Sequence, residues 1–356
     1  MPTPHRRVLI VRLSAMGDIL HALPAVSALR AAQPQLEIGW LVEERWLPLL
    51  RSRPNAAPLS HLPRSNAQPL VDFIHCSNLA LWRRSWLSSA TRSGLAQLIR
   101  ELRAQHYDAV IDFQGALRSG FLARLTCAHD IDIYGEDSPR EWIARYLFSH
   151  RVRTTGSHVI EQDLELASAF AATPLPYTPP LLPHDDEARQ WSRKQMHERP
   201  LVLMNPGAGW GAKCWPAERY GRVAQALFAM GLTVLVNAGP AERGLANQVA
   251  TESAGAARVV EPTLQQLIEL TRLSALFIGG DTGPLHLAAA LEVPTVAIFG
   301  PTDPARNGPF ANRAVILRSH RSQRNHARKS APEAGLLTIT PAEVLAAARN
   351  LLGHTL

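Results

Sequence analysis

Short apolar runs alternate along the chain with stretches whose apolar residues recur at helical spacing. Residues 8–13 form a continuous β-branched run that predicts a buried parallel strand, and residues 18–32 follow with the apolar spacing of a helix. Further strands are predicted at 36–42, 108–113, 131–134, 201–205, 233–237, 257–260, 275–279 and 295–299, and further helices at 95–104, 119–127, 217–230, 264–273, 284–291 and 341–352. Strands that alternate with helices predict βαβ units and parallel sheets.

Five prolines in ten residues separate the two series of elements. Proline fixes φ and lacks a backbone N–H, so residues 174–183 are predicted to be neither helix nor central strand. We interpret them as an interdomain linker, with an extended loop inside one domain as the alternative, and we interpret residues 185–187 as a helix start rather than a metal site. The predicted parts are a first Rossmann-like domain at 1–173, the proline-rich linker and helix start at 174–195, a second Rossmann-like domain at 196–340 and a C-terminal helix at 341–356.

Composition and charge narrow the class of protein. The 356 residues fit two domains, and 46% hydrophobic with 19% charged residues exclude a largely disordered chain. Lys and Arg number 37 against 30 Asp and Glu, so the net charge of +7 favours an anionic partner. The three cysteines are far apart, which excludes a disulfide framework and a zinc ribbon. Apolar runs are too short for a spanning helix, so a cytoplasmic protein is expected.

The strongest candidate site follows the predicted strand at 275–279. Residues 279–286 read GGDTGPLH and open a predicted helix. The glycines permit a close backbone approach, and the N–H groups at a helix start favour an anion. His286 lies in the first turn and can donate to a phosphate. The alternative is a capped helix in which Asp281 satisfies backbone donors and His286 is packed and neutral.

A second glycine-rich turn, NPGAGWGAKCWP at residues 205–216, also joins a strand to a helix. Its lysine, Lys213, could hold a phosphate as a flexible point charge. The turn is not a Walker loop, because no Ser or Thr follows Lys213, and Ala212 breaks the GxGxxG spacing. A solvated lysine on a surface loop is the alternative. Glu242, after the next strand, could accept from ribose hydroxyls or simply favour a helix dipole.

Weaker candidates end strands of the first domain. Asp18 closes the turn after the first strand and could act as a general base, or serve as a helix N-cap. Gln114 follows another strand and could line an acceptor site. Residues 82–86 (WRRSW) could grip a phosphorylated or carboxylated glycan, with a solvated face as the alternative.

A basic segment lies near the C-terminus. Residues 318–330 carry seven Arg, Lys or His side chains without apolar periodicity. A solvated loop is one interpretation, and attraction to phosphate or to an anionic membrane is the other.

Together these motifs resemble the ADP-heptose:lipopolysaccharide heptosyltransferases of glycosyltransferase family 9, and the type I enzymes best. The resemblance covers nearly the whole chain in the right order. Ala208 and Gly209 stand where type I members often carry hydroxyl residues and look more like type II, so the subclass is left open. The matching motifs are residues 11–24 for the amino-terminal signature, 82–86 and 108–115 for the type I first domain, and 213–216, 280–286 and 299–304 for the donor domain.

The resemblance implies an α/β GT-B fold, with two doubly wound Rossmann-like domains facing across a cleft. The first would bind the acceptor and the second the ADP-sugar. It implies an inverting transfer of L-glycero-D-manno-heptose from ADP-heptose to a Kdo residue of Kdo–lipid A. Asp18 would be the general base, Lys213 would hold the donor phosphate and Glu242 the ribose. The implied donor-binding residues are Ala208, Gly209, Lys213, Glu242, Asp281, Thr282, Gly283 and His286, and the implied acceptor-binding residues are Ser14, Arg83, Arg84, Gln114 and Arg118.

The resemblance also sets expectations about partners. No cofactor and no metal are expected, since ADP-heptose is a co-substrate. A peripheral contact with the anionic cytoplasmic face of the inner membrane is expected, and no nucleic acid; the sequence does not indicate an oligomeric state. Within the family, the alternatives are heptosyltransferase II or a paralogue with another acceptor. From other classes, they are a nicotinamide-dependent oxidoreductase, which the broken GxGxxG spacing disfavours, and a non-catalytic binder of anionic lipid or nucleic acid.

Overall fold

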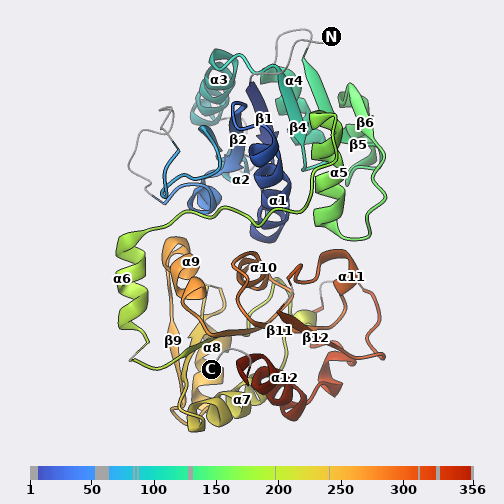
Figure 1. The fold of residues 1–356 in the computed structure, drawn as a ribbon. Coiled ribbons are helices and arrows are strands. Elements are labelled where there is room, and N and C mark those ends of the chain that lie inside the picture. The colour runs from blue at the N-terminus through green and yellow to red at the C-terminus, as the bar shows by residue number, and fades with distance from the viewer. Residues whose placement is uncertain are drawn as a thin grey trace. The chain divides into compact units, whose positions relative to one another are not determined.

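The computed structural model divides into two units, each with a six-stranded parallel sheet flanked by helices (Figure 1). The units are residues 1–184 and 185–356, so the division falls inside the predicted proline-rich linker. The structure describes residues 7–52, 64–82, 85, 88–126, 131–196, 198–239, 241–311, 313–325 and 329–353.

The first unit has the strand order β3-β2-β1-β4-β5-β6. Its strands are β1 (Arg7–Val11), β2 (Glu37–Glu43), β3 (Phe73–Ser77), β4 (Ala109–Asp112), β5 (Asp132–Glu136) and β6 (His150–Val152). Its helices are α1 (Met16–Ala32), α2 (Leu79–Trp82), α3 (Ser89–Ala104), α4 (Leu117–Thr126) and α5 (Val159–Ala171), with 3₁₀ turns η1 (Glu44–Leu49) and η2 (Trp142–Leu147).

The second unit repeats this topology with the order β12-β11-β10-β7-β8-β9. Its strands are β7 (Leu201–Asn205), β8 (Thr233–Asn237), β9 (Ala257–Val260), β10 (Leu276–Gly280), β11 (Thr295–Phe299) and β12 (Ala314–Arg318). Its helices are α6 (Asp186–Lys194), α7 (Ala217–Ala229), α8 (Arg243–Glu252), α9 (Leu264–Arg272), α10 (Gly283–Ala290), α11 (Pro304–Asn307) and α12 (Pro341–Gly353), with 3₁₀ turns η3 (Gly211–Lys213) and η4 (Leu336–Thr338).

The central strands form because their apolar side chains are covered on both faces, as parallel sheets require. All five residues of β7, β10 and β11 are buried, and so are all four of β4. Trp215 and Tyr220 pack with their rings at 4.9 Å beside the sheet of the second unit. The buried central strands of each sheet therefore fix the positions of the loops that follow them.

Helix starts follow the expected local chemistry. Asp185 caps α6 by accepting from the Ala188 amide at 2.9 Å, which confirms the predicted helix start. Thr340 and Glu343 exchange side-chain and backbone hydrogen bonds at the start of α12, as a capping box does. No helix within the described ranges is long and apolar enough to cross a membrane.

Candidate functional site

Both sheets reverse their strand order next to their first strand. In an open parallel sheet, ligands bind outside the carboxyl ends of the strands at this switch point. The reversal lies between β1 and β4 in the first unit and between β7 and β10 in the second. The turns at residues 14–18, 112–115, 205–216 and 279–286 leave these four strands, so each unit has candidate residues at its own switch point, whereas Glu242 follows β8.

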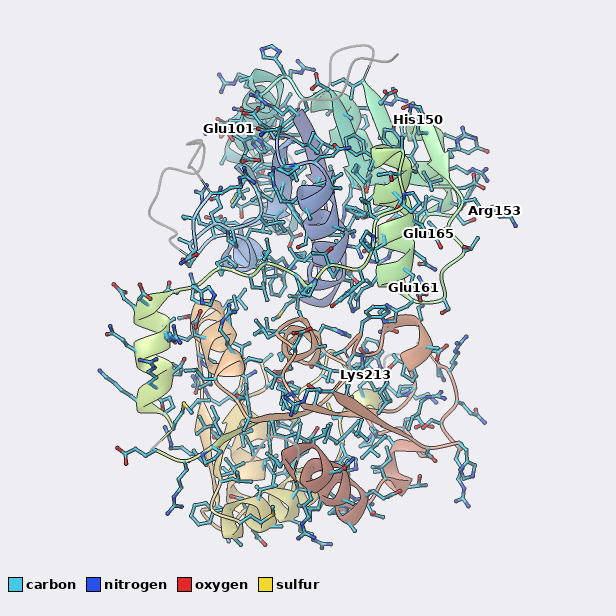
Figure 2. The ribbon with its side chains drawn as sticks, in the orientation of Figure 1. Glu101, His150, Arg153, Glu161, Glu165 and Lys213 are labelled. Atoms are coloured by element: carbon cyan, nitrogen blue, oxygen red, sulfur yellow. The ribbon has the colours of Figure 1, made fainter. Side chains whose placement is uncertain are left out.

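Three predicted donor residues meet in the second unit, where Figure 2 marks Lys213. The Lys213 ammonium lies 2.5 Å from Asp281 Oδ2 and also donates to the Asp281 backbone oxygen at 3.3 Å. His286 Nε2 lies 3.3 Å from Asp281 Oδ1. Trp210 covers the ammonium, with its ring centroid 4.3 Å from Nζ. A cation and a histidine therefore share one buried carboxylate at the start of α10.

Asp281 is ionised in this arrangement. Burial acts to raise the pKa of its carboxyl, but the hydrogen bond and charge of His286 and the ammonium of Lys213 outweigh burial and hold the pKa well below its ordinary value. Asn307 Nδ2 adds a donor 3.3 Å from Oδ1. Asp281 therefore holds Lys213 and His286 in place, and these two side chains are the groups suited to a phosphate.

The start of α10 supplies backbone donors beside this cluster. Its N-cap residue, Thr282, makes no capping hydrogen bond with its side chain, which instead donates to Gly280 O at 3.2 Å. Of the alternative interpretation, the N-cap residue is Thr282 and not Asp281, whereas His286 is buried as that interpretation expects. Asn205 Nδ2 lies 3.4 Å from Thr282 Oγ1, and Asn237 Nδ2 donates to Asn205 Oδ1 at 2.7 Å. These two asparagines end neighbouring strands, a signal that the sequence analysis left unused.

Glu242 lies against the glycine-rich turn that follows β7. Its backbone caps α8, but its side chain makes no capping bond. A Cβ on Gly207 would lie 2.2 Å from Glu242 Cδ, so glycine is needed for this close approach. Burial raises the pKa of Glu242, and the Gly239 amide opposes this. Ala208 is half-buried and Gly209 exposed, and a Cβ on Gly209 would meet nothing within 4 Å.

The basic segment packs onto this turn rather than extending into solvent throughout. Arg318 is the last residue of β12, and Arg324 pairs with Asp303. The Ala212 amide donates to Lys329 O at 3.0 Å. Residues 326–328 of the segment lie outside the described residues. The segment therefore belongs to the architecture around Lys213.

Asp18 lies in the first turn of α1 but is not its N-cap, which is Ala15. Asp18 Oδ2 accepts from the Ala15 amide at 3.1 Å, and Oδ1 lies 3.6 Å from the Arg12 guanidinium. Arg12 also donates to the Asp18 and Phe113 backbone oxygens. Arg12 and the Ala15 amide thus hold the Asp18 carboxylate in place, while 39% of the Asp18 side chain is exposed and can reach a substrate.

The predicted acceptor-binding residues of the first unit differ in how far they are buried. Gln114 is buried, and its Oε1 accepts from the Leu13 and Ser14 amides at 3.0 and 3.3 Å, so it positions the loop that leads to Asp18. Arg118 is exposed on the first turn of α4. Arg83 and Arg84 lie outside the described residues. Acceptor contacts by all of these residues remain predictions.

Two buried carboxyls, Asp112 and Asp163, lie close enough to Arg12 for its charge to act on them. Asp112 ends β4 and accepts from the Gln114 and Gly115 amides at 2.8 and 3.0 Å. Asp163 is buried on α5, which packs against α1. Burial raises the pKa of Asp163 to about 8; the charge of Arg12 opposes this, and those of Glu136 and Asp18 add to it. Burial likewise raises the pKa of Asp112 to about 6.

Asp163→Asn is expected to change how stability depends on pH. Asp163 titrates near pH 8 when folded and near its ordinary 3.8 when unfolded, so the folded state alone keeps the proton between these values. The free energy of unfolding therefore falls as pH rises through this window. Asparagine preserves the neutral form, so the variant should melt well above the wild type at about pH 8.5. The margin should be much smaller at about pH 5, because most of the window between 3.8 and 8 lies above that pH. A melting-temperature difference that is the same at both pH values would contradict this assignment.

Metal ligands do not gather in the described part of the chain. Among those residues, no group of three or more His, Cys, Asp or Glu side chains could hold a metal ion.

Comparison with known proteins supplies a family and relatives. The family model Glycosyltransferase family 9 (heptosyltransferase) matches residues 95–336. A curated relative, Lipopolysaccharide heptosyltransferase 1 of Pseudomonas aeruginosa, is 28% identical over 88% of this chain and 84% of its own length.

Solved structures share the fold. Escherichia coli heptosyltransferase WaaC with ADP-2-deoxy-2-fluoro heptose matches 97% of this chain and 99% of its own, with a TM-score of 0.75 and 23% identity. Escherichia coli ADP-heptose lps heptosyltransferase II matches 98% and 99%, with a TM-score of 0.77 and 22% identity. The predicted GT-B fold class, with two doubly wound Rossmann-like domains, is confirmed.

Proposed function

The chain belongs to glycosyltransferase family 9, and on this premise we propose that it transfers L-glycero-D-manno-heptose from ADP-heptose to a Kdo residue of Kdo–lipid A, with inversion. Membership makes it a glycosyltransferase and replaces the oxidoreductase and non-catalytic alternatives. The observation that carries the proposal is the cluster of Lys213, Asp281 and His286 at the switch point of the second sheet. The relative named heptosyltransferase 1 supports the sugar and the first-heptose acceptor.

The donor half of the proposal rests on charge. Lys213 and His286 would donate to the diphosphate beside the N–H groups at the start of α10, where the helix dipole favours an anion. An ammonium has three N–H donors, and the two acceptors that Lys213 reaches both belong to Asp281, so a phosphate oxygen can take the third. The same groups would stabilise the charge that develops on ADP as it leaves.

The acceptor half rests on Asp18. Its carboxylate would take the proton of a Kdo hydroxyl as that oxygen forms a bond to the anomeric carbon of heptose. The bond from that carbon to the β-phosphate oxygen breaks, and its electron pair leaves with ADP. One displacement inverts the anomeric centre, so a single base suffices. Arg12 and the Ala15 amide would keep the carboxylate oriented for this step.

The setting of the reaction is also proposed. The transfer would need no cofactor beyond the co-substrate and no metal, and we expect activity to survive treatment with a chelator. The enzyme would work peripherally at the cytoplasmic face of the inner membrane, where a lipid-linked acceptor is reached, and without nucleic acid. The net charge of +7 favours an anionic surface.

Turnover tests the function directly. Purified protein is incubated with ADP-heptose and Kdo–lipid A, and mass spectrometry detects the added mass of one heptose. Addition to Kdo–lipid A supports the proposal. Addition only to an acceptor that already carries one heptose would replace it with the second-heptose activity, which the type II character of Ala208 and Gly209 favours. Tight ADP binding without transfer to either acceptor would contradict the proposed acceptor.

Gly207→Ala tests the ribose contact of Glu242. The new Cβ would lie 2.2 Å from Glu242 Cδ and push the carboxylate aside. A lost hydrogen bond to a charged group corresponds to about 1.5–3 kcal/mol, so ADP affinity should fall by roughly tenfold or more. Calorimetry with ADP measures this. Gly353→Ala is the matched control, because the new Cβ would meet nothing within 4 Å and Gly353 is not among the residues assigned to the donor. Equal affinities of the two variants would remove Glu242 from the site.

A further inference from the structure

The most exposed aromatic side chains of the described chain gather on two neighbouring elements of the first unit. Trp142, Tyr146 and Phe121 are 66%, 60% and 58% exposed, more than any other large hydrophobic residue described. Leu117 and Ile143 are also exposed, at 39% and 44%. We call these five residues the aromatic patch. Single exposed apolar residues are ordinary, but several on adjacent elements mark an interaction surface.

The packing of α4 on η2 brings the patch together. A Cβ on Gly120 would lie 2.8 Å from Leu147 Cδ1, so the two elements approach closely there. The Leu117 amide donates to Glu141 Oε2 at 2.8 Å, and Arg124 Nε donates to Leu147 O at 2.9 Å. Leu117 and Phe121 stand one turn apart on α4 and share one face. The patch therefore spans one helix and the 3₁₀ turn beside it.

The rings of η2 are held in a fixed arrangement while exposed. Trp142 and Tyr146 meet edge to face, with their centroids 6.2 Å apart. The Arg151 guanidinium lies over the Tyr146 ring at 5.5 Å. Amphipathic rings of this kind settle at the boundary between lipid and water.

Arginines accompany the patch. Arg118 and Arg124 are exposed on α4, Arg140 is exposed just before η2, and Arg151 is exposed on β6. The nearby carboxylates have partners within the protein: Asp137 Oδ1 accepts from Arg145 at 2.7 Å, and Glu141 accepts from a backbone amide. The surface thus combines apolar anchors with positive charge. Each arginine near an anionic bilayer adds to its binding.

We propose that the aromatic patch and these arginines form the surface by which the protein docks on an anionic phospholipid bilayer. Charge complementarity favours lipid over a second copy of this chain, which would bring like charges together. The α4 end of the surface starts directly after the loop that holds Gln114, at the ligand-binding end of the first sheet. Docking there would bring that end toward a lipid-linked acceptor. This last link rests on the proposed function, whereas bilayer binding does not.

Vesicle sedimentation without donor or acceptor tests the surface. The full chain is mixed with vesicles of phosphatidylethanolamine and phosphatidylglycerol, or of phosphatidylcholine alone. We expect binding to the anionic vesicles that weakens in high salt, and a loss of at least roughly tenfold in the double variant Phe121→Ser, Trp142→Ser. Phe228→Ser, which removes a 46% exposed aromatic from α7, is the matched control and should bind as the wild type does.

Other results would overturn the docking surface. These are equal vesicle binding by the double variant and the wild type, equal binding to neutral vesicles, or a wild-type dimer that the double variant abolishes. The double variant Arg140→Glu, Arg151→Glu is a second test of the surface. Both side chains are exposed, so reversing their charges should weaken the binding of the protein to anionic vesicles only. Turnover on a delipidated, water-soluble acceptor is followed in parallel. If the double variant turns over this soluble acceptor normally, its loss of vesicle binding is a loss of docking and not of catalysis. If neither the wild type nor any variant turns it over, the proposed function is contradicted and the docking surface is not.

Discussion

Asp18→Asn is expected to lower kcat by roughly 10²–10⁴-fold, the usual contribution of a positioned general base, with little change in ADP affinity. The asparagine oxygen can still accept from the Ala15 amide, so the first turn of α1 should keep its geometry. What is lost is the ability to take a proton from the acceptor hydroxyl. Steady-state turnover and ADP calorimetry on the same preparation measure the two effects.

Asp186→Asn is the matched control for this experiment. Asp186 is also an acidic residue in the first turn of a helix, but it is exposed on α6 at the start of the second unit. It should turn over as the wild type does. If Asp18→Asn weakened ADP binding strongly and left the chemical step intact, Asp18 would be a donor-binding residue and not the base.

Asp163 offers a check on that assignment. It lies close enough to feel the charges of Arg12 and Asp18, yet it is buried and protonated at neutral pH. Its substitution by asparagine should leave kcat near the wild-type value around pH 7. A fall as large as that of Asp18→Asn would show that proton transfer depends on both carboxyls.

The sequence predicted the centre of each sheet better than its edges. The apolar runs of β1, β4, β7 and β10 stand out because these strands are covered on both faces. The unpredicted strands β3, β6 and β12 are all edge strands. β6 has three residues, two of them exposed, and β12 leads directly into the basic segment. An edge strand needs less continuous apolar character, so its pattern is weak.

The candidate site was predictable where its chemistry sits on the turns after central strands. Lys213, Asp281 and His286 were found for this reason, and the structure brings them into contact. Asn307 and Asp163 were missed because their partners lie far away in the sequence and no local pattern marks them. Gln114 shows a second limit. The sequence placed it at the correct strand end, but only packing shows that its side chain turns inward to hold a loop.

Lys213→Ala is expected to weaken ADP binding by roughly 10- to 150-fold, which corresponds to about 1.5–3 kcal/mol for a hydrogen bond to a charged group. The substitution also leaves the Asp281 carboxylate with one cation fewer. Because Lys213 and His286 together hold the pKa of Asp281 down, removing the ammonium should raise that pKa and lower stability near neutral pH. Binding must therefore be measured well below the melting temperature of the variant.

Two further variants separate loss of the contact from loss of the fold. Lys194→Ala removes an exposed lysine from α6 of the same unit and should bind ADP as the wild type does. Lys213→Arg keeps the positive charge beside Asp281 but not the geometry of the ammonium, so it should retain stability while ADP affinity falls to an intermediate value. If calorimetry gave the same ADP affinity for Lys213→Ala and the wild type, the ammonium would serve only to neutralise Asp281, and phosphate binding would fall to His286 and the start of α10.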